Sequence, residues 1–295
     1  MLYCLNKEQL ENLSKTYFLA DFKNAEMVVA TFVTDINIAK KIVPHPLSVT
    51  HDSLATAFVA RYPDTNFGCV YNEGALFIHC KYKGENGLYC LSMPVDDDMA
   101  MVGGREQFGY PKKMADNITL NQDNNTVVGS VIRKGVEILR IECQLGEEVG
   151  ENFLNYLGDP TLDWDGVPCT RVLSFLFKYF QNPGGGGFDY LPRLIREPIL
   201  FRTDGKILGG EGKVKLSSTP YDPLGEVPVG EIVKVFFGKW HNTMLPGRVV
   251  AKIWNPIKFA KHAFFKIDAA ATLISSFDPN RSDRAKEIFR AAKKY

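Results

Sequence analysis

The sequence of 295 residues predicts an α+β protein that consists mainly of antiparallel β-strands. Between residues 54 and 145, segments rich in β-branched and aromatic residues alternate with short clusters of Gly, Asn and Asp. This spacing is typical of hairpins in an antiparallel sheet. The composition, with 45% hydrophobic and 23% charged residues, is that of a globular protein with a sizeable core.

The first elements are predicted to be a helix, a strand and a second helix. Asn6 and Gln9 have the spacing of a capping box and precede a short amphipathic segment. Residues 26–34 (EMVVATFVT) are strand-like. Residues 36–43 predict a helix that ends before Pro44, because the residue before a proline avoids the helical conformation.

The second half of the chain predicts one helix, several strands and a last helix. Apolar residues at helical spacing between 172 and 180 predict the first of these. Strand-like segments follow at 196–202, 210–218, 229–238, 246–254 and 262–271. Ser282 followed by Asp283 predicts the start of a final helix over residues 284–294.

Charge and cysteine content narrow the class of partner. Thirty-five Lys and Arg against 34 Asp and Glu give a formal charge of +1, so no strong field attracts nucleic acid or an anionic membrane. No CxxC pair occurs, and the five histidines are scattered, which predicts reduced cysteines and no metal site. Without a signal-peptide pattern or a run of about 18 apolar residues, we expect a cytoplasmic protein that binds a small molecule.

The segment Gly104–Ala115 (GREQFGYPKKMA) carries the strongest chemical signal. A Pro-Lys-Lys sequence is usually a solvated turn, but here two adjacent lysines stand among apolar, aromatic and small residues. A lysine attacks a ketone only as the free amine, and its ordinary pKa is about 10.4. An apolar pocket or a neighbouring cation makes the charged form costly and so activates the amine. The residues alone leave both interpretations open.

This segment resembles the signature of the acetoacetate decarboxylase family. In that signature Gly-Arg-Glu is followed by an aromatic residue, Pro and two lysines, of which the first forms the Schiff base. Here the first lysine is Lys112. The likeness continues back to residues 64–65, which puts the acidic residue of the family's pocket on Glu73, and a weaker similarity covers roughly residues 20–270.

The resemblance implies a cone-shaped β-barrel with a flanking sheet and a few helices, formed as a single domain over residues 1–295. It implies that the lysine lies inside the barrel and that the chain assembles into homo-oligomers. The implied reaction is imine formation between Lys112 and a β-keto acid, loss of carbon dioxide and hydrolysis. No metal or organic cofactor is implied, because the protonated imine itself accepts the electron pair.

The resemblance also assigns roles to individual residues. Lys112 is the nucleophile, and Glu73 orients it or carries a proton to the enamine carbon. Lys113 can lower the pKa of its neighbour by repulsion. Successive side chains of a strand point to opposite faces, however, so desolvation is expected to contribute more. Arg105 and Glu106 are expected to form a structural ion pair and hydrogen-bond anchor that positions the lysine loop.

The pocket walls and two departures from the family bear on the substrate. Met99, Met101, Phe108 and Tyr110 are the candidate apolar walls. Ordinary core packing explains each of them equally well.

The family's substrate-binding arginine and second glutamate fall at about Ala25 and on Phe58. Phe58 makes the pocket more apolar, so the expected substrate is acetoacetate or a related, longer or more apolar β-keto acid. Lys23 or Arg61 is the alternative cation for a substrate carboxylate.

Two other functions stay open. Some members of the family keep the imine lysine but carry out aldol condensation and dehydration on keto acids such as pyruvate. A closed barrel can also hold a ligand without catalysis. A carrier has no need for a lysine in an apolar lumen, where the charge costs several kcal/mol of desolvation, and this favours an enzyme.

Overall fold

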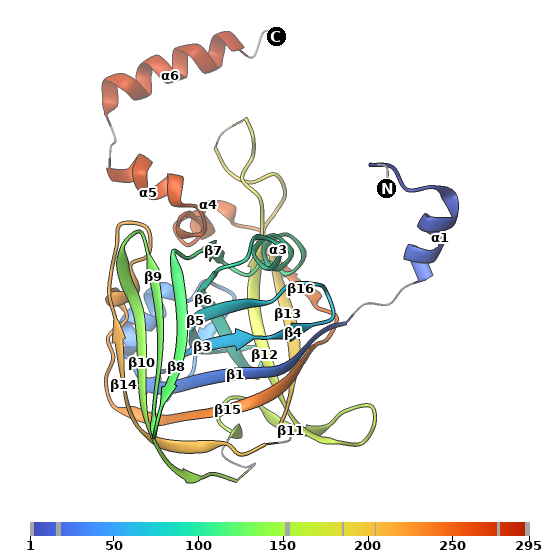
Figure 1. Cartoon of the computed structure of the whole chain (residues 1–295). Coiled ribbons are helices and arrows are strands. Elements are labelled where there is room, and N and C mark those ends of the chain that lie inside the picture. Colours follow the sequence, from blue (N-terminus) through green and yellow to red (C-terminus); the bar gives the residue numbers. More distant parts are fainter. Residues whose placement is uncertain are drawn as a thin grey trace.

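The computed structural model describes residues 3–15, 19–150, 154–184, 186–203, 205–275 and 278–292. A closed barrel of seven strands lies at its centre (Figure 1). They are β1 (Ala20–Val33), β3 (Leu54–Tyr62), β5 (Tyr71–Tyr82), β6 (Glu85–Val95), β12 (Pro168–Lys178), β13 (Arg193–Arg202) and β15 (Ile232–Met244). Round the wall the order is β13, β12, β6, β5, β3, β1, β15, and β15 pairs again with β13. The neighbours are antiparallel except β6 and β12, so the predicted, mainly antiparallel barrel is confirmed.

A flanking layer covers one side of the barrel (Figure 1). It contains β8 (Asn117–Asp123), β9 (Thr126–Arg133), β10 (Val136–Glu148) and β14 (Leu208–Leu216), which continue the sheet from β15. Side chains of both layers share one core, in which Val28 and Val59 of the barrel join Val131 and Ile141 of the flanking strands. Because both faces of β1 are covered, most of its residues are buried and apolar with no strict alternation.

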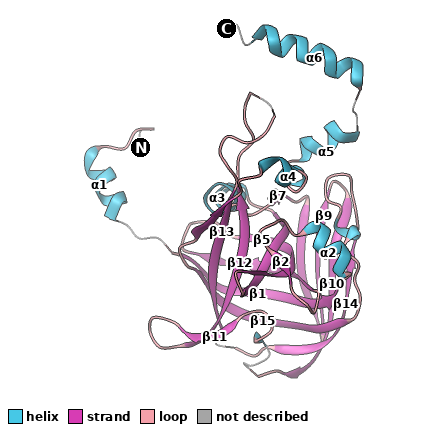
Figure 2. Ribbon diagram, turned by 180° about the vertical axis from the view of Figure 1, so that it is seen from behind, coloured by secondary structure: helices cyan, strands magenta, loops and turns pink. Residues whose placement is uncertain are grey.

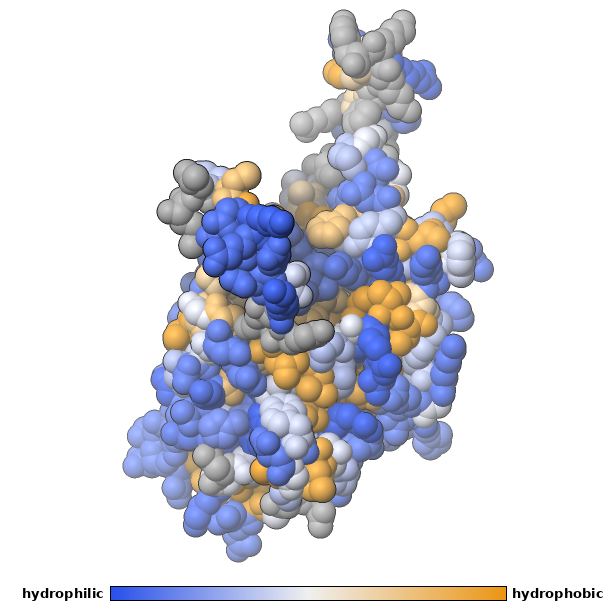
Figure 3. Space-filling model, turned by 90° about the vertical axis from the view of Figure 1, so that its right-hand side faces the viewer, coloured by the Kyte–Doolittle hydropathy of each residue, from blue (hydrophilic) through white to orange (hydrophobic). Residues whose placement is uncertain are grey.

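The remaining strands are short and the helices lie outside the barrel (Figure 2). The strands are β2 (Ser48–Val49), β4 (Asp64–Thr65), β7 (Lys112–Met114), β11 (Asp159–Leu162) and β16 (Arg248–Lys252). The helices are α1 (Lys7–Lys15), α2 (Ile36–Ile42), α3 (Asp98–Gly103), α4 (Pro256–Ala260), α5 (Asp268–Ser275) and α6 (Pro279–Ala292), with shorter turns η1 (Gly104–Phe108), η3 (Leu224–Glu226) and η4 (Phe264–Lys266). None of these described helices has the length and apolar character needed to cross a membrane. The face in Figure 3 is mainly hydrophilic with scattered apolar patches.

The two predicted helices near the N-terminus are confirmed. The Gln9 amide donates to Asn6 Oδ1 at 2.8 Å and the Asn6 amide donates to Gln9 Oε1 at 2.9 Å, which is the reciprocal capping box of α1. The Asp35 carboxylate accepts from the amides of Asn37 and Ile38 and caps α2.

Two predictions for the second half are wrong. Residues 172–180 lie mostly in strand β12, not in a helix. Both faces of β12 are buried, with Val172 inside the barrel and Phe175 in the shared core, and such a continuous apolar run does not distinguish a strand from a helix. Residues 262–271 form η4 and the start of α5, not a strand. The last helix begins at Pro279, before the predicted start.

Candidate active site

A short helical segment between β6 and β7 positions Lys112 at the end of the barrel. After β6 the chain forms α3 and the π-helical turn η1, and it returns as β7, whose Lys112 pairs with Met93 of β6. The return needs Gly109, which has φ +96° and whose missing Cβ would lie 2.9 Å from the Lys178 Cα. The loop that carries the lysine is therefore fixed against both β6 and β12.

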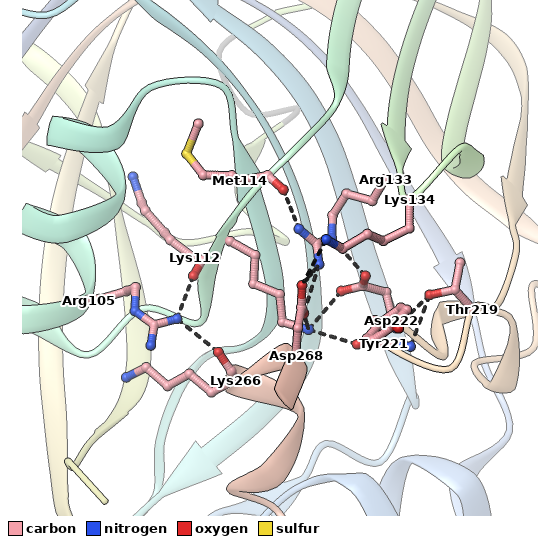
Figure 4. Close-up of polar contacts among 11 residues, drawn as sticks. Arg105, Lys112, Met114, Arg133, Lys134, Thr219, Tyr221, Asp222, Lys266 and Asp268 are labelled. Atoms are coloured by element: carbon pink, nitrogen blue, oxygen red, sulfur yellow. Dashed lines mark hydrogen bonds and ion pairs between the residues drawn. The ribbon is translucent and has the colours of Figure 1, made fainter. Parts of the chain in front are cut away.

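Arg105 holds this loop in place. Its Nη1 donates to the carbonyl oxygens of Lys112 at 2.8 Å and of Lys266 at 2.9 Å (Figure 4). The predicted ion pair between Arg105 and Glu106 is wrong, because Glu106 is exposed and the two are not paired among the described residues. Arg105 holds the loop through hydrogen bonds to backbone carbonyls, which agrees with the expected hydrogen-bond anchor.

Lys112 is buried inside the barrel beside a carboxylate. Its side chain is 8% exposed, and its Nζ lies 2.7 Å from Oε2 of Glu73, which comes from β5. This contact is an ion pair that lacks the alignment of a hydrogen bond. The ammonium also lies 5.1 Å from the ring centre of Tyr71 and 5.9 Å from that of Tyr110. Aromatic rings at this distance attract the cation and exclude water from it.

The cavity around these two residues is otherwise uncharged. Its volume is about 280 Å³, and Lys112 and Glu73 are the only charged groups among the described residues that line it. The lining is largely apolar, and its aromatic residues include Phe22, Phe58, Phe77, Phe108, Phe201 and Phe236. Coulomb interactions are strong in such low-dielectric surroundings, so the charges on Lys112 and Glu73 interact mainly with each other.

The predicted wall residues lie in different places. Phe58, Phe108 and Tyr110 line the cavity, and so does Met99, which is 54% exposed. Met101 is not among the lining residues and packs against the apolar core beside it. Its assignment to the wall is wrong, because Met99 and Met101 are two positions apart on a helix and point to different sides.

Glu73 has a second neighbour in Tyr62. The Tyr62 hydroxyl donates to Glu73 Oε1 at 3.5 Å. Burial, with the nearby Glu73 charge, raises the pKa of the Tyr62 and Tyr71 phenols well above the ordinary value. Both tyrosines therefore remain neutral near neutral pH, and Tyr62 can only donate to the carboxylate.

Lys113 points away from the cavity and has its own acidic partners. Its Nζ lies 3.0 Å from Asp222 and 3.1 Å from Asp268, and it donates to the Tyr221 carbonyl at 2.7 Å. Arg133 binds the same two aspartates (Figure 4). Lys113 lines a separate cavity on the other side of β7, as the alternation of strand side chains predicts.

The expected cations for a substrate carboxylate are not in the cavity. Lys23 is exposed, and Arg61 pairs with Glu26 outside the barrel. Strand β1 presents Met27 and Val29 to the cavity, and Ala25 is not in the lining. The alternative that Lys23 or Arg61 supplies the cation is wrong. Adjacent side chains of a strand point to opposite faces of the sheet, and those of Lys23 and Arg61 point away from the cavity.

Sequence patterns missed three buried polar residues on the far strands. Trp240 and Asn242 of β15 line the cavity, and Glu197 of β13 lies opposite Ser174, another lining residue. Trp240 Nε1, Asn242 Oδ1 and both carboxylate oxygens of Glu197 have no hydrogen-bond partner among the described residues. No spacing in the sequence marks these positions, because their importance depends on the closure of the barrel.

Glu197 predicts an unusual dependence of stability on pH. The side chain is fully buried, and burial raises its pKa from 4.5 to about 8. A carboxyl group whose pKa is higher in the folded than in the unfolded protein stabilises the fold at low pH. This contribution is fully present below the pKa of the unfolded state. It is lost as the pH rises through the pKa of the folded state, by about 1.4 kcal/mol per pH unit. The free energy of unfolding of Glu197→Gln minus that of wild type is therefore expected to rise by about 3 to 4 kcal/mol from about pH 5 to about pH 8.

Urea unfolding of both proteins at the two pH values measures this difference. The exposed Glu211 of β14 provides the control, because Glu211→Gln leaves the burial of both states unchanged. Parallel stability curves for wild type and Glu197→Gln would contradict a neutral buried carboxyl group.

A lysine and a carboxylate buried together in an otherwise uncharged barrel cavity define a small-molecule enzyme. The family model of acetoacetate decarboxylase (ADC) matches residues 9–253. The acetoacetate decarboxylase of Acidiphilium cryptum is 31% identical over 216 residues, which cover 72% of this chain and 80% of that protein. That of Burkholderia cenocepacia is 36% identical over 223 residues, which cover 70% and 89%. The chain belongs to the acetoacetate decarboxylase family, and it is an enzyme of the carbon–carbon lyase class.

Solved structures agree in fold. Acetoacetate decarboxylase from Legionella pneumophila superposes with a TM-score of 0.69 at 23% identity and covers 80% of this chain and 88% of its own. The enduracididine biosynthesis enzyme MppR, complexed with pyruvate, superposes with a TM-score of 0.61 at 16% identity and covers 80% and 91%. At these low sequence identities, the superpositions show a common fold alone.

Proposed function

We propose that this enzyme decarboxylates a β-keto acid through an imine on Lys112. The observation that carries the proposal is the 2.7 Å contact between Lys112 Nζ and Glu73 in a cavity with no other described charged lining residue. In such surroundings two charged groups are more costly to bury than the neutral amine and the neutral acid. Glu73 can therefore accept the proton from the Lys112 ammonium and release a nucleophilic amine.

The amine adds to the ketone carbon and forms a carbinolamine. The Glu73 acid returns its proton to the hydroxyl, which leaves as water, so that the protonated imine and the Glu73 carboxylate result. The bond to the substrate carboxylate then breaks, and its electron pair moves into the imine to give a neutral enamine and carbon dioxide. This step turns a carboxylate into a neutral product, and an apolar cavity without a further cation favours that change.

The enamine carbon then takes up a proton, and water hydrolyses the imine. Overall the reaction consumes one proton from solvent. Glu73, within contact distance of Lys112 Nζ, is the group we assign to deliver it. The ketone leaves and the lysine is regenerated, with no step that needs an oxidant or a reductant.

Borohydride trapping tests the proposal. The enzyme is incubated with acetoacetate, a longer β-keto acid or pyruvate, reduced, and digested for peptide mass spectrometry, while released carbon dioxide is measured in parallel. A reduced adduct on Lys112 together with carbon dioxide from a β-keto acid supports decarboxylation. An adduct with pyruvate and consumption of an added aldehyde, without carbon dioxide, would instead support aldol chemistry. Absence of an adduct with every carbonyl compound would support a carrier.

Gly104 is expected to be essential for the position of the nucleophile. A Cβ at this residue would lie 2.7 Å from both Cδ and Cε of Lys112, so Gly104→Ala must displace the lysine side chain. The backbone at Gly104 is helical, with φ −62° and ψ −40°, and accepts alanine without strain. We expect kcat/KM for decarboxylation to fall by about 100-fold, the effect of a misplacement of about 1 Å, with a nearly unchanged melting temperature.

The adjacent glycine provides a matched control. Gly103 is also helical, and a Cβ there would meet no heavy atom within 4 Å. Gly103→Ala is expected to change kcat/KM far less than Gly104→Ala. Equal losses in the two variants would show that the methyl group acts on the helix and not on Lys112.

We further infer that the enzyme is a homo-oligomer. Val249, Trp254 and Ile257 are large apolar side chains that lie close together in sequence and are 51%, 79% and 86% exposed. Exposed apolar groups of this size are typical of protein interfaces. Light scattering during size-exclusion chromatography, for wild type and Trp254→Ser, measures the mass of the assembly and the contribution of this segment.

A further inference from the structure

A second buried lysine, outside the reactive cavity, has no acidic partner. Lys266 of η4 is 7% exposed, and its Nζ donates to the Gly109 carbonyl at 3.3 Å and lies 4.8 Å from the ring centre of Tyr179. No carboxylate among the described residues lies within ion-pair distance of this Nζ, which points away from Asp222 and Asp268 in Figure 4. Buried charges in proteins are normally paired, so Lys266 is a candidate partner for an anion.

The groups around Lys266 do not neutralise its charge. Burial lowers the pKa of Lys266 to about 7, with a further contribution from the positive charges of Arg105 and Lys178. Cys90 and Tyr179 also lie nearby, but burial raises the pKa of both, so they are neutral near neutral pH. The two aspartates on the other side of the lysine loop already bind two cations. An anion beside Lys266 would therefore stabilise its ammonium form.

Lys266 lines the second cavity, on the far side of β7 from the reactive pair. This cavity has a volume of about 280 Å³, and Gly109 and Tyr179, the two contacts of the ammonium, also line it. Lys112 and Glu73 are not among its lining residues, so a molecule bound there is separate from the reactive cavity. Much of the remaining wall is apolar or aromatic, with Ile42, Tyr89, Leu91, Phe177, Phe259 and Phe265.

The lining selects the chemical class of the ligand. A carboxylate accepts hydrogen bonds from an ammonium, and its single charge matches the one unpaired buried cation. Of the other lysines in the lining, Lys113 is paired, and Lys41 and Lys261 are exposed. Phosphate lacks an apolar body and near neutral pH carries more than one negative charge, for which a single buried ammonium is a poor match.

We propose that the second cavity binds a small monocarboxylic acid, with its carboxylate on Lys266 and its apolar body against the aromatic wall. This site adds a ligand to the enzyme beyond the proposed substrate. Its test does not depend on the imine at Lys112, because β7 separates the two cavities.

Hexanoate and hexanamide test the proposal, because they have nearly the same shape and differ in charge. Isothermal titration calorimetry is carried out on the Lys112→Met protein, in which the reactive cavity offers no lysine to a carboxylate. We expect one site that binds hexanoate at least about tenfold more tightly than hexanamide, as a hydrogen bond between charged groups would give. Butyrate, which is two methylene groups shorter, is expected to bind about tenfold more weakly than hexanoate.

A second substitution locates the site. Lys266→Met, added to Lys112→Met, is expected to abolish the preference for hexanoate without lowering the melting temperature, because it replaces an unpaired buried charge with an apolar side chain. Lys258→Met, added in the same way, is the control, because Lys258 of α4 is exposed and is not among the lining residues. This protein is expected to keep the preference.

Four outcomes would overturn the site. They are the absence of saturable hexanoate binding, equal affinity for hexanoate and hexanamide, tighter binding of inorganic phosphate than of hexanoate, and a preference for hexanoate that survives Lys266→Met. The first three are measured with Lys266 intact, so they remain decisive even if the Lys266→Met protein does not fold.

Discussion

Lys112→Met is expected to lower the rate of decarboxylation by about 10,000-fold or more, the scale seen when a covalent nucleophile is removed. Methionine keeps an unbranched chain of similar length and fills the same space, but it has no amine. Glu73 then loses its ion-pair partner, and no other charged residue among those described lines the cavity. The rate of carbon dioxide release and the borohydride adduct measure the loss, and the thermal melting curve shows that the fold is retained.

The neighbouring lysine allows the same substitution to be tested one residue away. Lys113 pairs with Asp222 and Asp268 on the other side of β7. Lys113→Met is expected to keep the adduct on Lys112 but to lower the free energy of unfolding by about 3 kcal/mol. This is the lower end of the cost of breaking a buried ion pair, because Arg133 still binds both aspartates. Loss of the adduct in a well-folded Lys113→Met protein would instead support direct activation of Lys112 by its neighbour.

The proximity of Lys112 and Glu73 could be predicted through the resemblance to the family. Lys112 lies in the segment that resembles the family's signature, and the same likeness places the acidic residue of the family's pocket on Glu73. The mainly antiparallel strands could be predicted from the sequence itself, since hairpins between residues 54 and 145 depend on local turn residues, whereas the barrel followed from the family resemblance. The opposite orientation of Lys113 also follows from strand geometry alone.

The rest of the site depends on contacts between distant segments. Trp240 and Asn242 reach the cavity only because β15 pairs with both β1 and β13 and so closes the barrel. Glu197 has a raised pKa because the fold buries it, with no hydrogen-bond partner among the described residues, and burial by distant segments has no signature in the sequence. The failed helix at 172–180 has a related cause: strand β12 is covered on both faces, so it lacks the alternation that marks a half-exposed strand.

Glu73→Gln is expected to separate formation of the imine from its turnover. Glutamine has nearly the same shape but neither accepts nor supplies a proton at this position. Water must then take the proton from Lys112 and protonate the leaving hydroxyl, so the adduct that borohydride traps is expected to form more slowly but to remain detectable. Protonation of the enamine carbon then lacks its donor. Removal of a general acid typically slows the reaction by about 100-fold to 10,000-fold, and we expect kcat to fall within this range.

Two measurements on the same protein decide whether Glu73 acts as the proton donor. Carbon dioxide release in a single turnover is expected to slow less than release of the ketone, because water can replace Glu73 in the earlier proton transfers at nitrogen and oxygen, whereas protonation at carbon lacks its donor and the enamine accumulates. Glu73→Asp provides the matched variant: it keeps the acid but shortens the side chain, so it is expected to recover part of the lost rate. If Glu73→Gln instead slows formation of the adduct and ketone release equally, the carboxylate acts by orienting Lys112. In that case the proton for the enamine comes from water and not from Glu73.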